Sequence, residues 1–121
     1  MNKQEVYNKV RAHLLTQRAR SVLADCPAGM ACAYRGVGGL KCAIGCLIED
    51  KHYDPEFERF GVGKTSVRDA LRLSGVAYDV DFLSALQVIH DNSPLCQWEA
   101  DLESVREKYL EVADVTLQSQ T

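Results

Sequence analysis

The fold depends on a segment near the middle of the chain that reads Tyr34-Arg35-Gly36-Val37-Gly38-Gly39-Leu40-Lys41-Cys42-Ala43-Ile44-Gly45-Cys46-Leu47-Ile48. Its first half is basic and rich in glycine, which permits the positive φ angles that a tight reversal requires. We expect a short β-hairpin or extended turn before Cys42, in which Ala31–Tyr34 pairs with Leu40–Lys41. The apolar second half predicts a buried helix from about Lys41 to Glu49.

Helical patterns flank this segment on both sides. Apolar residues at helical spacing predict helices over about 3–18, 65–73, 79–92 and 95–113, and Pro55 begins a further short helical turn. Thr65 or Ser66 is a suitable N-cap for the helix that Ser74-Gly75 ends, and Asp79 or Asp81 caps the next. The sequence thus predicts a mainly α fold of about five helices around one core.

Length and composition narrow the class of protein. The 121 residues, 46% of them hydrophobic, suit one globular α-helical domain over residues 1–115, followed by a frayed tail at 116–121. The net charge is −3, and lysine and arginine are not clustered densely enough in the sequence to bind nucleic acid. No signal peptide or membrane-length apolar run is visible. Five cysteines, an odd number, indicate buried thiols in a reducing compartment, so we expect a cytoplasmic protein.

The sequence contains parts of two ligand-binding motifs, a phosphate-binding loop and a zinc site, but neither motif is complete. The segment Gly61-Val62-Gly63-Lys64-Thr65-Ser66 ends as a phosphate-binding loop does, but Glu58 stands where the first glycine is required. A glycine hinge before a helix explains it better. Cys42 and Cys46 share a helical face that Cys26 and Cys32 could approach, yet the spacing is not that of a zinc knuckle. We therefore expect no metal and no cofactor.

A thiol nucleophile is the most specific enzymatic hypothesis. It would use Cys42 or Cys46 near a helix N-terminus, with His90 as the base and Asp91 or His13 nearby. The competing interpretation is that both histidines are core residues, because each follows apolar residues on its helical face.

A polar and aromatic group surrounds the central segment. It comprises Tyr34, Arg35, Tyr53 and Asp54, with Glu56 and Glu58 beside them. Exposed tyrosine and arginine commonly anchor protein interfaces. The alternative is that the tyrosines form the edge of the core and Arg35 pairs with a nearby carboxylate.

Several of these motifs occur together in one group of proteins. The motifs are Tyr34-Arg35-Gly36, Gly39-Leu40-Lys41-Cys42-Ala43-Ile44-Gly45, Tyr53-Asp54-Pro55, Ile89-His90-Asp91 and Trp98. In this combination the chain resembles a family of small uncharacterised proteins from bacteria and their phages. The resemblance extends from Leu14 to about Tyr109. It implies a small intracellular domain, often encoded by phages or prophages, without any transferable activity or catalytic residue.

The sequence favours a non-enzymatic binding or accessory protein that acts on a protein partner, for example as a phage-type inhibitor. Its binding residues would be Tyr34, Arg35, Lys41, Tyr53, Asp54, His90 and Asp91. The alternative is a small-molecule or nucleotide-binding domain that uses Arg35, Lys41 and the glycine-rich loop around an anion, or the thiol enzyme described above. The apolar stripe of the last helix could serve a homodimer as readily as the core.

Overall fold

The computed structural model describes residues 1–22 and 33–110, and helical turns account for 66% of these. There are four α-helices in the described ranges: α1 (Lys3–Gln17), α2 (Thr65–Leu73), α3 (Val80–Asn92) and α4 (Trp98–Tyr109). Five short 3₁₀ turns connect them: η1 (Val37–Gly39), η2 (Gly45–Leu47), η3 (Asp50–His52), η4 (Pro55–Arg59) and η5 (Leu95–Gln97). The mainly α prediction is confirmed, with one α-helix fewer than the five expected.

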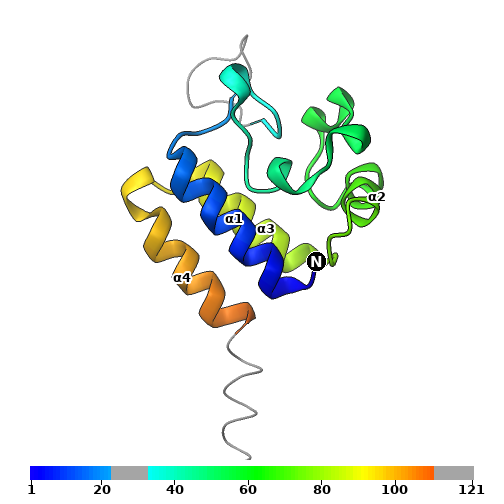
Figure 1. Ribbon diagram of the computed structural model, residues 1–121. Helices are drawn as coiled ribbons and strands as arrows, with labels where there is room; N and C mark the ends of the chain where they lie inside the picture. Colours follow the sequence, from blue (N-terminus) through cyan, green and yellow to red (C-terminus); the bar gives the residue numbers. More distant parts are fainter. Residues whose placement is uncertain (23–32, 111–121) are drawn as a thin grey trace, which may run out of the picture.

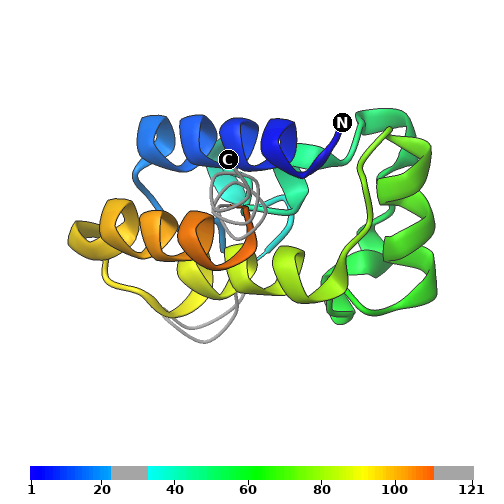
Figure 2. The same ribbon diagram turned by 90° about the horizontal axis from the view of Figure 1, so that it is seen from below.

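The helices α1, α3 and α4 pack together and form one half of the molecule (Figure 1). Figure 2 shows the same three helices from below, with α2 at one end of the group. The short turns between residues 37 and 59 lie over this helical base. Residues from both halves, among them Leu14, Leu47, Phe82 and Trp98, form a continuous buried core. The irregular half is therefore held by apolar packing on the helices.

Local capping explains where several helices begin and end. The side chain of Asn2 accepts the N–H of Glu5, whose carboxylate accepts the N–H of Asn2, so α1 starts with a capping box. Asp79 caps α3 by accepting the N–H of Phe82, as expected. After α2, Gly75 adopts a φ of 82°, a left-handed conformation that ends the helix.

The N-terminal boundary of α2 differs from the prediction. Its N-cap is Lys64, which provides no side-chain hydrogen bond, and the helix already includes Thr65 and Ser66. A backbone hydrogen bond joins the helix start to the preceding turn instead, because the N–H of Lys64 donates to the carbonyl of Gly61. The predicted caps were wrong by one or two positions, a common error for helix ends.

The extended turn before Cys42 is present in a minimal form. An antiparallel bridge joins Arg35 to Lys41 around η1, and no strand occurs within the two described ranges. Gly38 and Gly39 have φ angles of 69° and 76°, so glycine is needed at both positions. Residues 31 and 32 of the predicted pair lie outside the described residues.

The predicted helix from Lys41 to Glu49 is wrong: only η2 forms there. Several backbone N–H groups in this segment bond to distant residues. Cys42 donates to the carbonyl of Tyr34, Ile44 to the side chain of Gln87, and Glu49 to the hydroxyl of Ser74. These tertiary bonds replace the regular helical pattern while leaving the buried N–H groups satisfied.

The last helix is shorter than expected at its start, because residues 95–97 form η5 before α4 begins. Trp98 is 1% exposed and donates its indole N–H to the carbonyl of Ser93. The predicted extension to residue 113 and the tail at 116–121 fall outside the described residues. No helix in the described part of the chain is long and apolar enough to cross a membrane.

Candidate functional site

Glu58 connects three of the residues predicted to form a binding surface. Its carboxylate accepts the backbone N–H of Tyr34 at 2.8 Å and that of Arg35 at 3.0 Å. It also accepts the hydroxyl of Tyr53. Burial, together with this negative charge, raises the pKa of the Tyr53 hydroxyl above its usual range. Tyr34 is itself buried and donates its hydroxyl to the carbonyl of Phe60. The cluster is thus internally hydrogen-bonded.

The side chain of Arg35 is also engaged within the protein. Its guanidinium donates to the carboxylate of Asp50 and to the carbonyl of Ile48, both at 2.6 Å. It lies over the ring of Tyr53, 4.6 Å from the centroid. Asp54, which was placed in the same group, accepts the N–H of Glu56 and caps η4. Arg35 therefore neutralises Asp50 and is held by contacts within the protein.

His90 and Asp91 belong to a second network, on α3. Nε2 of His90 accepts the N–H of Ser21 at 2.9 Å, so the neutral ring carries its proton on Nδ1. Nδ1 then donates to the carboxylate of Asp91 at 2.8 Å. Asp91 also accepts the side-chain amide of Gln87. Both nitrogens of this fully buried ring are therefore occupied by structural partners.

The thiols of Cys42 and Cys46 do not have the surroundings of an activated nucleophile. Burial raises the pKa of Cys42 to about 12, and its sulfur accepts the N–H of Gly45. Burial also raises the pKa of Cys46 to about 12, against the opposing effect of Lys9 and Lys41. In the described residues no hydrogen bond joins His90 to either thiol, so the proposed thiol–histidine pair is not assembled.

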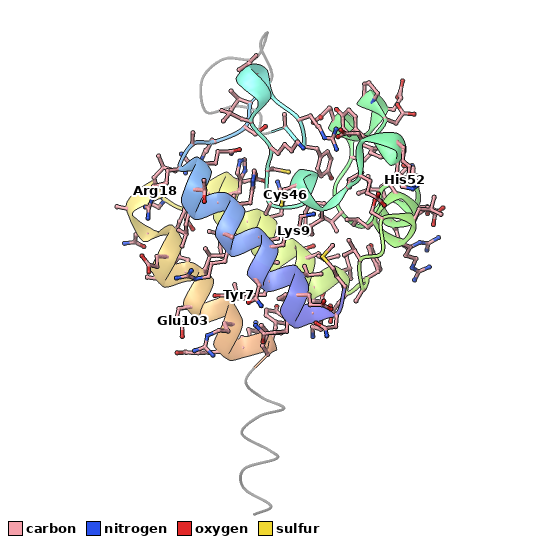
Figure 3. All side chains as sticks on the ribbon, viewed as in Figure 1. Tyr7, Lys9, Arg18, Cys46, His52 and Glu103 are labelled. Carbon is pink, nitrogen blue, oxygen red and sulfur yellow. The ribbon has the colours of Figure 1, made fainter. Side chains whose placement is uncertain are left out.

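A charged groove lies between α1 and the segment that follows the glycine-rich turn. We call it the lysine groove and define it by the residues that line it: Lys9, Lys41, Cys46, Ile48, Glu49, Asp50 and Lys51. Its volume is about 440 Å³. Figure 3 shows Lys9 projecting from α1 close to Cys46. The groove thus combines residues from three parts of the chain.

The ammonium groups of the lysine groove are not neutralised from within. Within residues 1–22 and 33–110, Lys9, Lys41 and Lys51 form no ion pair. Of the two carboxylates at the groove, Asp50 is paired with Arg35 and Glu49 is not. Three ammonium groups against one uncompensated carboxylate leave the groove positive, although the chain as a whole is negative.

Two side chains of α1 fix the backbone of Lys41. Gln17 accepts the N–H of Lys41 at 3.0 Å and donates to its carbonyl at 2.9 Å. Nε2 of His13 also bonds to that carbonyl, at 2.8 Å. These bonds attach the residue before Cys42 to the same helix that supplies Lys9, so both lysines are held at the groove that they line.

A second, smaller cavity of about 110 Å³ has acidic walls. Tyr34, Glu58, Gln87 and Asp91 contribute the polar groups of its lining. This volume would hold only three or four water molecules at about 30 Å³ each. The two carboxylates already accept hydrogen bonds from the protein, so their arrangement is explained by the networks described above.

The structure separates the predicted site residues into three places. Tyr34, Arg35, Tyr53 and Asp54 surround Glu58 and η4, His90 and Asp91 lie in the α3 network, and Lys41 alone lines the lysine groove. Lys9, Lys51 and Cys46 were not among the predicted binding residues. No group of three or more metal-ligating side chains occurs in the described part of the chain, and Cys26 and Cys32 lie outside it.

Comparison with models of known protein families, with curated proteins and with solved structures finds no match to this chain.

Proposed function

We propose that this chain is a non-enzymatic binding protein whose contact site is the lysine groove and whose partner is an acidic segment of another protein. The observation that carries the proposal is the set of three ammonium groups at one groove that have no ion-pair partner among the described residues. Binding of this kind would let the chain act as an accessory or an inhibitor of its partner.

The composition of the groove favours a protein segment over a small apolar molecule. Five of its seven lining residues are charged, with Cys46 and Ile48 as the exceptions. Sites for small molecules are mostly apolar with a few polar groups, even when their volume is similar. A charged, open surface instead suits a partner that brings complementary charge.

The charge of the rest of the chain supports the same partner. The net charge is −3, so the lysine groove is a positive site on a chain that is negative as a whole, and an acidic segment is attracted there. Complementarity of this type mainly increases the association rate and the specificity of binding. It also makes binding depend on ionic strength, because exposed charges are screened over about 10 Å at 0.1 M salt.

The test uses a fluorescent peptide of alternating glutamate and glycine, with a glutamine and glycine peptide as the uncharged comparison. Fluorescence anisotropy is expected to detect binding of the first peptide alone, and added salt is expected to weaken it. The double variant Lys9→Gln/Lys41→Gln is expected to bind at least about fivefold more weakly, at about 0.5–1 kcal/mol for each exposed charge.

The control is Lys108→Gln, which removes an exposed charge on α4 outside the groove. It is expected to leave the affinity unchanged. Equal binding of the two peptides, or an unchanged affinity in the double variant, would overturn the proposal.

A further inference from the structure

The lysine groove has features that distinguish between two kinds of acidic group. Resting on the function proposed above, we infer that the preferred ligand of the groove is a phosphorylated side chain of the partner segment, held by Lys9, Lys41 and Lys51 together. A glutamate or aspartate side chain would be accepted at the same place with lower affinity.

The first argument is the number of donors. The three lysines come from α1, from the bridge that closes the glycine-rich turn, and from η3, so they approach the groove from separate elements. A phosphoryl group has three terminal oxygens, each of which can accept from a different ammonium group. A carboxylate has two oxygens, so two of the three ammonium groups would have to share one of them.

The second argument is charge. Arg35 neutralises Asp50, with 2.6 Å between a guanidinium nitrogen and a carboxylate oxygen. Glu49 is then the one carboxylate of the lining that balances the three ammonium groups, so the groove has two net positive charges. A phosphorylated serine or threonine carries a charge of about −1.5 to −2 at neutral pH. It therefore matches the groove, whereas a carboxylate leaves about one positive charge uncompensated.

The third argument is the kind of cation. The guanidinium of Arg35, which pairs with the lining residue Asp50, is engaged by Asp50, Ile48 and the ring of Tyr53. The cations that face the groove are ammonium groups, which act as compact point charges. Lysine lacks the planar fork with which arginine binds a carboxylate in a bidentate manner. The groove thus selects for charge density and not for planar geometry.

The experiment compares three peptides that share one uncharged sequence and differ at the central position, which is serine, glutamate or phosphoserine. Anisotropy titration at neutral pH is expected to give the phosphoserine peptide roughly five- to tenfold tighter binding than the glutamate peptide. The serine peptide is expected not to bind. Inorganic phosphate, as a competitor, is expected to displace the phosphoserine peptide only at concentrations far above the peptide's dissociation constant.

The variant Lys51→Gln tests whether the third ammonium group is used. Lys51 is exposed, so its replacement is expected to leave the fold intact. It is expected to reduce the affinity for the phosphoserine peptide by a larger factor than the affinity for the glutamate peptide. Lys108→Gln serves as the control and is expected to change neither.

The outcomes separate the two proposals. Equal affinities for the glutamate and phosphoserine peptides would overturn the phosphate preference and leave the acidic-segment proposal standing. An absence of binding by both, and by the glutamate-rich peptide, would overturn the two together. Displacement by inorganic phosphate at the dissociation constant of the peptide would overturn the assignment of a peptide as the ligand.

Discussion

The carbonyl oxygen of Tyr34 lies 1.9 Å from the point that a Cβ on Gly45 would occupy. The two backbones touch because the N–H of Cys42 donates to that same carbonyl and draws η2 against the residue before Arg35. Glycine is therefore required at position 45 for reasons of space, since its backbone has no positive φ angle.

Replacement of Gly45 by alanine is expected to destabilise the protein by at least about 2 kcal/mol, since backbone atoms on both sides must shift. The free energy of unfolding from urea titration measures this effect. Gly61→Ala is the matched control, because nothing lies within 4 Å of a Cβ built there. A loss of stability in Gly45→Ala no greater than in Gly61→Ala would show that the close approach is absent.

Glu58→Gln is expected to destabilise the fold by about 1.5–3 kcal/mol. The carboxylate accepts three donors, from Tyr34, Arg35 and Tyr53, and the amide of glutamine would present its own N–H groups to some of them. Urea titration again provides the measurement. The control is Glu56→Gln in the same turn, where the side chain is exposed, and a change within about 0.5 kcal/mol is expected. Equal effects of the two substitutions would contradict the role given to Glu58.

Alkaline pH is expected to destabilise the protein through Cys42. Its pKa rises from an ordinary 9.0 to about 12 in the folded state, so the folded state holds the thiol proton more tightly than the unfolded state does. The stabilisation is complete below pH 9.0 and is lost as the pH rises toward 12. The contribution of one such group has a slope of up to about 1.4 kcal/mol per pH unit.

Urea midpoints measured from about pH 8 to about pH 10 test this dependence. In Cys42→Ala the slope above pH 9.0 is expected to be shallower than in the unmodified chain. Cys96→Ala, at an exposed thiol, is expected to keep the original slope. An identical slope in all three proteins would mean that Cys42 is not the responsible group.

The helices that could be predicted from the sequence are those whose signals are local. Asp79 caps α3 through its own neighbour Phe82, and Gly75 ends α2 by its own conformation. The helix expected at Lys41–Glu49 failed for the opposite reason. The amide partners of that segment, such as Gln87 and Ser74, are distant in sequence, and periodicity contains no information about them.

The candidate site was predicted only in part. Lys41 was identified because it follows the glycine-rich turn, whereas Lys9 is an ordinary exposed charge on a polar helical face. Lys51 is likewise one exposed lysine in a short turn. Their relation appears only when α1 lies against the segment after Lys41. Clusters assembled from residues this far apart in sequence leave no local pattern.

Trp98, the chain's one tryptophan, is 1% exposed and has its ring centroid 5.8 Å from that of His90. The protein therefore contains a natural optical reporter at the contact between α3 and α4. Its intrinsic fluorescence is expected to shift to longer wavelength when water reaches the indole, so loss of the helical core can be followed without any attached dye. Trp98 does not line the lysine groove, so binding there is expected to leave that emission unchanged, which separates unfolding from ligand binding in a single sample.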